Sequence, residues 1–373
     1  MTNWKLVRLN FGRSPVHFGE TGIGLENTTE RVRSDTLFSA WMSVYARIFG
    51  SEKVKDLLAQ FTNNPGQPPF QLSSTFVYRC PKDSNGVIYY LPKLLARPSG
   101  YPSDDLSFAK TYKKLHYLPL ELWQRWYQGS GFLTQDRTDL ETYTKDPEDK
   151  SIPLAKVGCF AYGEAFKAYT LPKVAVDRTH HATNFYHTGL IQFAWETTEP
   201  NQDDWDHSGV QNLAGLYFLL EFPTADPELE ADLYQSLAML GEEGIGGERS
   251  SGAGRFTIQA WEELPANWQA VVNFNQSNHY SLVSLFWQPE ISQTQIGDSA
   301  RYAIQERGGW IASPFSGRQL RRKKVQMFAE GSVFAHKPEG QLADVTPSGF
   351  TRHSIYRSGL ALSLPVRLEA NSS

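Results

Sequence analysis

Residues 241–256 read GEEGIGGERSSGAGRF, a stretch in which six of sixteen residues are glycine. Glycine adopts positive φ angles and lets another group approach the backbone closely. Successive backbone N–H groups in such a loop form a concave site for anions, and serine and arginine add further donors. The stretch therefore predicts a loop that binds a sugar-phosphate chain, with contacts from Gly244, Ile245, Gly246, Gly247, Arg249, Ser250, Ser251, Gly252, Gly254 and Arg255. The competing interpretation is a plain helix-to-strand turn.

The flanking segments argue against two familiar nucleotide-binding motifs. The triphosphate loop reads G-x-x-x-x-G-K-[ST] between a strand and a helix, and the dinucleotide loop reads G-x-G-x-x-G in the same context. Here the glycines follow the amphipathic run ELEADLYQSLAML and precede the strand-like run RFTIQAW, and no lysine holds the required place. Neither ATP nor NAD is expected, and no cofactor is predicted.

The segments on either side of the glycine stretch predict an α+β fold. Residues 4–11 alternate apolar and polar residues as a strand does, and residues 34–49 have the apolar spacing of a helix. With the later runs, and with an insertion at about 95–185 set aside, the order is strand, helix, strand, strand, helix, strand. This is the βαββαβ order of ferredoxin-like (RRM-like) units, whose sheet leaves one face open for a partner. Residues 1–262 are predicted as one such domain and 278–373 as a smaller second one.

Composition and charge narrow the class of protein. The chain has 373 residues, 13% of them aromatic, and a net charge of −4, with basic residues concentrated in RQLRRKK at 318–324. An acidic chain can still present one basic surface, and aromatic side chains supply stacking platforms for bases. Two distant cysteines form neither a disulfide framework nor a zinc pattern, and no apolar run is long enough for a bilayer. We expect a cytoplasmic protein without membrane contact.

Several side chains outside the glycine stretch are candidates for contact with a polyanion. Ser34 is predicted to cap the helix at 34–49, and Asp35 to favour its N-terminus, whereas Arg31 and Arg33 fit a structural and a phosphate-binding role equally well. The segment RTHHATNFYHTG (178–189) offers phosphate and stacking contacts, and its histidines fit no dedicated metal motif, so no metal is predicted. The candidates are His17, Arg33, Ser34, Arg178, Tyr186, Arg318, Arg321 and Arg322.

Several stretches, in this order along the chain, resemble the RAMP superfamily of CRISPR proteins and, within it, the Csm subunit four family of type III-A effector complexes. These stretches are SPVHFGE (14–20), RSDTLFSA (33–40), SSTFVY (73–78), YYLPKL (89–94), the glycine stretch and SPFSGRQLRRKKVQMFAEGSVF (313–334). The glycine stretch by itself indicates only the superfamily. The last stretch together with SDTLFSA is more specific. The resemblance indicates the subtype less specifically than the role, because related subunits of type III-B and III-D complexes share the architecture.

The resemblance implies a non-catalytic subunit at the base of the effector complex. Such a protein holds the repeat-derived 5′ handle of the CRISPR RNA and contacts the large polymerase-like subunit on one side and the first RAMP backbone subunit on the other. Two alternatives remain. One is a metal-independent CRISPR RNA-processing endonuclease that uses His17 as a general acid or base. The other is a protein-interaction subunit whose basic segment meets acidic neighbours.

Overall fold

The computed structural model describes residues 3–19, 24–64, 66–82, 86–103, 105–177, 179–180, 182–197, 209–311 and 320–369. Within these ranges, no helix is both long and apolar enough to cross a membrane. The fold mixes helices with antiparallel sheets, as the sequence predicts.

The largest sheet is built from strands far apart in the chain. Its strands lie in the order β11-β1-β10-β3-β4-β5, and β2 pairs with one end of β10. All of these pairs are antiparallel. The strands are β1 (Asn3–Asn10), β2 (Gln71–Leu72), β3 (Phe76–Arg79), β4 (Ile88–Pro92), β5 (Tyr117–Pro119), β10 (Ala214–Phe222) and β11 (Thr257–Glu263). With α1 (Ser34–Phe49) and α7 (Pro227–Glu243), the predicted succession is present as β1, α1, β3, β10, α7 and β11.

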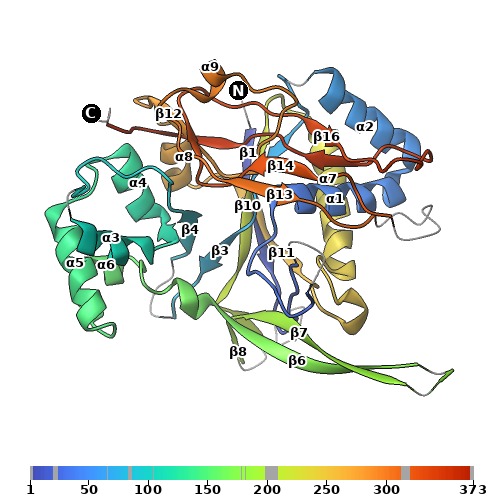
Figure 1. The fold of residues 1–373 in the computed structure, drawn as a ribbon, viewed down its shortest axis with the longest axis horizontal. Helices are drawn as coiled ribbons and strands as arrows, with labels where there is room; N and C mark the ends of the chain where they lie inside the picture. The colour runs from blue at the N-terminus through green and yellow to red at the C-terminus, as the bar shows by residue number, and fades with distance from the viewer. Residues whose placement is uncertain are drawn as a thin grey trace.

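Helices α1, α2 (Ser51–Asn63) and α7 cover one face of this sheet (Figure 1). Helix α7 begins where the side chain of Asp226 accepts a hydrogen bond from the Leu229 N–H, with proline in the first turn. Trp41 of α1 is fully buried between the two helices and donates from Nε1 to Ser236 Oγ at 2.9 Å. The apolar spacing of both helices therefore serves a single shared core.

The second face of the sheet is covered, which contradicts the predicted open face. Every residue of β10 is buried, and Tyr217 and Leu219 pack in a core with Trp126, Trp268 and Val366. Those partners come from the insertion, from α8 (Ala266–Val272) and from the C-terminal strands. The run AGLYFLLEF carries this signal in the sequence, because continuous apolar runs are typical of strands buried on both faces.

The insertion divides into a helical lobe and a long hairpin (Figure 1). The lobe packs three fully buried aromatic residues, Trp123, Trp126 and Tyr127, and is thus better packed than the sequence suggests. The run FYHTGLIQFAW lies in the hairpin and not in the main sheet, which the chain rejoins only at β10. The elements are α3 (Leu106–Lys113), α4 (Leu120–Gln128), α5 (Thr134–Lys145), α6 (Pro153–Lys156), the 3-10 turn Tyr162–Ala165, the hairpin strands β6 (Phe166–Val176) and β7 (Thr183–Phe193), and the short pair β8 (Trp195–Thr197) and β9 (Val210–Asn212).

The described residues of 278–373 do not have the predicted second βαββαβ succession. They form the three small sheets β15-β12-β18, β13-β14 and β16-β17, with α9 as their one helix, four residues long. Val333, Leu364 and Val366 join the core under the main sheet, whereas Leu282, Phe286, Phe334 and Ala361 form a small separate cluster within this part. The elements are β12 (His279–Leu282), α9 (Gln293–Ile296), β13 (Ile304–Arg307), β14 (Val325–Phe328), β15 (Val333–Phe334), β16 (Leu342–Asp344), β17 (Tyr356–Ser358) and β18 (Ser363–Val366).

Two buried carboxylates join the start of α1 to these C-terminal strands. Glu330, whose side chain is 1% exposed, accepts hydrogen bonds from Arg31 at 3.0 and 3.2 Å, from Arg33 at 2.5 Å and from Ser74. Burial opposes ionisation of Glu330, but the two arginines and the hydrogen bonds outweigh it and hold the pKa well below its usual range. Asp35 is also fully buried and receives hydrogen bonds from Arg307 and Arg357.

We expect Glu330→Gln to lower the free energy of unfolding by about 3–5 kcal/mol, because it leaves two arginines without their buried counter-charge. The matched control is Glu306→Gln, which breaks an exposed pair with Lys324 and should change stability by less than about 1 kcal/mol. Urea unfolding measures both. Since the folded pKa of Glu330 is depressed, its stabilisation is present above the unfolded value of about 4.3 and is lost as the pH falls toward the folded value. Equal effects of the two variants would contradict this role.

Candidate nucleic-acid interface

Five of the six glycines of residues 241–256 make room for the protein's own backbone or side chains, and Gly252 is the exception. A Cβ at Gly254 would lie 2.1 Å from the Ile245 carbonyl oxygen, and one at Gly241 would lie 2.3 Å from the Phe256 carbonyl oxygen. A Cβ at Gly246 would lie 2.4 Å from the carbonyl oxygen of His17. Internal packing therefore explains the glycines at these three positions, and contact of Gly246 and Gly254 with a polyanion stays a prediction.

The backbone N–H groups of this loop are also used within the protein. Ile245 donates to the Gly254 carbonyl at 2.9 Å, Gly247 to His17 at 2.9 Å and Gly254 to Pro15 at 2.8 Å. Ile245 itself is buried, as are the neighbouring apolar side chains of the loop. The first and last parts of the loop therefore pack against residues 15–17 and donate hydrogen bonds to their backbone.

The tip of the loop keeps the chemistry that the sequence predicts for it. Arg249, Ser250, Ser251 and Arg255 are exposed, and Gly252 has a φ of +83° with nothing within 4 Å of a Cβ built there. Lys173 of β6 reaches this tip and contacts the carboxylate of Glu248 and the hydroxyl of Ser251. Arginine and hydroxyl donors thus lie beside the hairpin, at a surface open to a large ligand.

His17 connects the loop to the hairpin. Its side chain is 6% exposed and donates from Nδ1 to the Gly189 carbonyl of β7 at 2.8 Å, while Val16 pairs with Ile191 on the same edge. A Cβ at Gly247 would lie 2.6 Å from the His17 ring. This position matches the interpretation of His17 as a loop histidine that bonds backbone, and leaves its ring little surface for contact with RNA.

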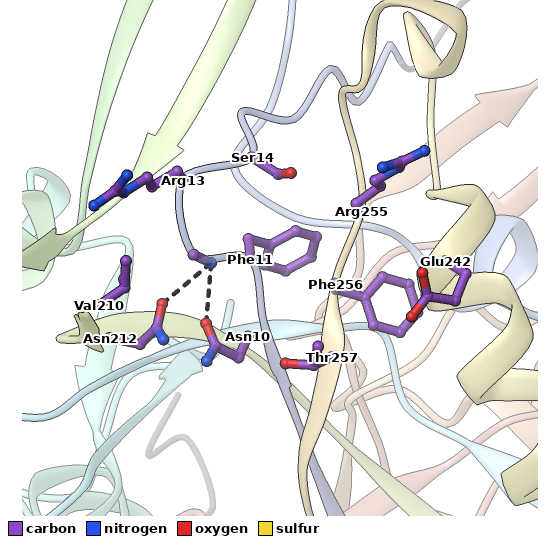
Figure 2. Close-up of a pocket in the computed structure, with 12 residues that line it drawn as sticks. Asn10, Phe11, Arg13, Ser14, Val210, Asn212, Glu242, Arg255, Phe256 and Thr257 are labelled. Atoms are coloured by element: carbon purple, nitrogen blue, oxygen red, sulfur yellow. Dashed lines mark hydrogen bonds between the residues drawn. The ribbon is translucent and has the colours of Figure 1, made fainter. Parts of the chain in front are cut away.

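A pocket of about 380 Å³ lies next to Arg255, between the ends of β1, β9 and β11. Ser14 lies between the side chains of Arg13 and Arg255 at one rim, and Asn10, Asn212 and Thr257 line the other (Figure 2). The Gly12 N–H donates to Asn10 Oδ1 at 3.0 Å and to Asn212 Oδ1 at 3.1 Å. The pocket combines cationic, amide and hydroxyl groups with the carboxylate of Glu242, and the rings of Phe11 and Phe256 beneath them are 3% and 5% exposed.

Three guanidinium groups in this region, those of Arg13, Arg249 and Arg255, lie in no ion pair with any described residue. The Arg13 guanidinium lies 5.0 Å from the Trp195 ring centroid, which holds it without neutralising it. Sequence reasoning missed Arg13, Asn10 and Asn212. The polar turn GRS directly before SPVHFGE was the available signal for Arg13.

The hairpin carries exposed apolar and aromatic side chains. Phe185 is 61% exposed, and Val174, opposite it in the ladder, is 55% exposed. The predicted contact Tyr186 lies on the other face, paired with Lys173 and therefore on the side that reaches the glycine loop. His180 pairs with Asp177 at 3.0 Å, and no group of three metal-ligating side chains forms among the described residues.

The remaining predicted contacts lie apart from this region. Arg33 is paired with Glu330, and Ser34 is 1% exposed, accepting from the Leu285 N–H at 2.9 Å, so neither side chain is presented to RNA as predicted. Arg33 and not Ser34 precedes the first helical turn. Arg321 and Arg322 lie in the C-terminal part, and Arg178 and Arg318 lie outside the described residues.

Comparison with known proteins finds relatives over almost the whole chain. Residues 275–366 match the model of the CRISPR Csm4 C-terminal domain. A Csm4 protein of Mycobacterium tuberculosis is 27% identical over 97% of this chain and 98% of its own length. One of Methanocaldococcus jannaschii is 24% identical over 94% of each chain. The C-terminal part of this chain thus matches the Csm4 family model, and almost the whole chain is similar in sequence to Csm4 proteins.

Solved Csm4 structures share its fold. The crystal structure of a Csm3–Csm4 subcomplex in the type III-A CRISPR-Cas interference complex covers 97% of this chain and 99% of that one, with a TM-score of 0.59 and 17% identity. A Csm1–Csm4 cassette in complex with pppApA covers 99% of each chain, with a TM-score of 0.50 and 17% identity. Csm4 proteins are subunits of type III CRISPR effector complexes, as the sequence resemblance implies.

Two alanine substitutions separate the packed and open parts of the glycine loop in this chain. Gly254→Ala meets a carbonyl oxygen at 2.1 Å and has a φ of +80°, whereas Gly252→Ala has a similar φ but open space. We expect Gly252→Ala to cost about 1–2 kcal/mol and Gly254→Ala about 3 kcal/mol or more, because the second adds a steric clash to the backbone strain. Urea unfolding of both variants is the measurement. Equal losses would show that the loop does not pack against itself.

Proposed function

We propose that this chain is a non-catalytic, cytoplasmic RNA-binding subunit of a type III CRISPR interference complex that holds the 5′ handle of the CRISPR RNA. The observation that carries the proposal is the set of guanidinium groups of Arg13, Arg249 and Arg255 around the pocket and the loop tip, which form no ion pair with a described residue. Phosphate groups of a single strand would neutralise them, and a base would enter beside Phe11 and Phe256. The chain is acidic overall, so this concentration of unpaired cations is local.

The sheet order supports assignment of the first part to the ferredoxin-like RAMP units. Strands β11, β1, β10 and β3 correspond to the fourth, first, third and second strands of a βαββαβ unit. Because the second sheet face is buried, we place the RNA along the loop tip and the hairpin instead of on the sheet. Ligand binding there uses loops held by a rigid frame, which is where binding residues concentrate.

The same proposal makes this chain a junction between protein subunits. Relatives of the same fold have been crystallised with Csm3 and with Csm1. We propose that this chain likewise joins the large polymerase-like subunit to the RAMP backbone subunits. The non-catalytic assignment is supported by His17, whose ring is buried and donates to a backbone carbonyl instead of facing the pocket.

We expect the double variant Arg249→Ala, Arg255→Ala to weaken binding of handle RNA from the cognate repeat by about tenfold or more at low salt. It should also reduce the slope of log Kd against log salt by about 1.4, since each lost phosphate contact on a single strand removes about 0.7. Filter binding over a salt series measures both quantities. The control is Arg97→Ala, Arg352→Ala, which removes two exposed arginines outside residues 241–256 and the pocket. Unchanged affinity in the first variant would contradict the proposal.

A second experiment separates binding from catalysis. Incubated with precursor CRISPR RNA in the absence of metal, the purified chain is expected to leave the RNA intact, because His17 offers no exposed general acid or base. Denaturing gel electrophoresis follows the RNA. Specific cleavage that disappears in His17→Ala would overturn the non-catalytic assignment and favour the processing endonuclease.

A further inference from the structure

A cluster of arginines surrounds Asp35 at the start of α1. Arg307 donates to both carboxylate oxygens, at 2.9 and 3.0 Å, and Arg357 donates to Oδ2. The three side chains are at most 5% exposed. One carboxylate thus serves two buried guanidinium groups, and the Arg357 Nε atom is buried with no hydrogen-bond partner among the described residues.

Arg322 adds a third cation to this cluster. It is held there by its backbone, which donates to Gly309 at 2.9 Å, and by its Nε, which donates to the Trp310 carbonyl at 3.0 Å. Burial and the charges of Arg357 and Arg307 lower its pKa to about 10, with Asp35 acting in the opposite direction. Arg322 is in no ion pair with a described residue, whereas Lys324, two positions on, pairs with Glu306 at 2.7 Å.

The local sequence cannot supply the missing negative charge. Residues 308–324 contain five arginines and lysines and neither aspartate nor glutamate. A like-charged, partly buried cluster is costly to hold together without a counter-ion. The fold nevertheless fixes it, because Asp35 is anchored in the first turn of α1 and Gly308 accepts a hydrogen bond from Arg357.

An aromatic side chain lies beside the cluster. Trp310 is 38% exposed, and its backbone pairs with that of Arg321 in an isolated β-bridge. The Arg321 guanidinium lies 4.8 Å from the centroid of the Trp310 ring. A tryptophan next to arginines offers stacking to a base whose phosphate is bound by the guanidinium groups.

We propose that Arg322, Arg357 and Trp310 form a second anion site that takes the phosphate group of a nucleotide. It is separate from the glycine-loop region, since β13 and β14 lie in the upper part of Figure 1 and the β6–β7 hairpin extends from the lower part. The phosphate would accept from Arg322, which is less buried than Arg357, and would offset the charge of the buried Arg357 behind it. Inorganic phosphate and an RNA backbone share this chemistry, and only the RNA case rests on the proposed function.

Thermal unfolding of the full chain with inorganic phosphate, at constant ionic strength set with chloride, tests the site. Phosphate should raise the melting temperature of the wild type. Arg322→Gln should weaken the apparent phosphate affinity by about tenfold or more, because a charge-assisted contact is lost. Without phosphate, Arg322→Gln should melt no lower than the wild type, because it relieves charge crowding. The control Lys324→Gln removes one cation from the same segment and should keep the phosphate response.

Further arms keep the outcomes distinct. If Arg322→Gln does not fold, Arg322→Lys replaces it and should also weaken the response, since lysine lacks the planar fork. The variant Arg249→Ala, Arg255→Ala should keep the phosphate response even where it loses handle RNA, so the two proposals fail separately. With an eight-nucleotide oligouridylate, Arg322→Gln should lose affinity in fluorescence anisotropy if the phosphate belongs to RNA, whereas unchanged affinity would restrict the site to free phosphate. Equal phosphate responses in the wild type and Arg322→Gln, or a response to polyglutamate alone, would overturn the site.

Discussion

Reciprocal buried ion pairs between the start of α1 and the C-terminal part hold this fold together. Arg31 and Arg33, just before α1, neutralise Glu330 of the C-terminal part, while Arg307 and Arg357 of that part neutralise Asp35 in α1. Neither part can bury its own carboxylate, because an isolated buried charge costs several kcal/mol. Some residues of the C-terminal strands are consequently part of the core under the main sheet, beside a smaller cluster of their own. The same exchange fixes Leu285 against Ser34 and so sets where the C-terminal strands lie.

Covering the second sheet face changes where a ligand can bind. Because every residue of β10 is buried, the sheet face cannot bind a ligand. The side chains that a ligand can reach lie at the ends of the strands and on the long hairpin. Residues 15–18 lie between the hairpin and the glycine loop, bonded to both. The loop tip, the pocket and the hairpin therefore form one mechanically connected region, although they come from four separate segments.

The glycine stretch has two structural roles. Its outer glycines let the loop fold back on itself and grip residues 15–17, and this packing presents the tip with Arg249, Ser250 and Ser251 to solvent. Close approach to the backbone was the correct physical inference from the glycine count. The partner in that approach was the protein itself, as the interspersed Ile245, Ala253 and Phe256 could have indicated.

The sequence by itself determined the helices α1 and α7, the succession β1, α1, β3, β10, α7 and β11, and the presence of a large insertion, because periodicity reports local structure directly. It also indicated the similarity to Csm4 proteins, through short stretches spread over the chain, and the exposed cations at Arg249 and Arg255. Tertiary structure alone decided that Arg33, Ser34 and His17 are occupied by structural contacts, that Arg13 joins the pocket, and that the C-terminal part forms small sheets. The reason is that these outcomes depend on which distant group meets a side chain or a glycine, and neither spacing nor composition encodes that partner.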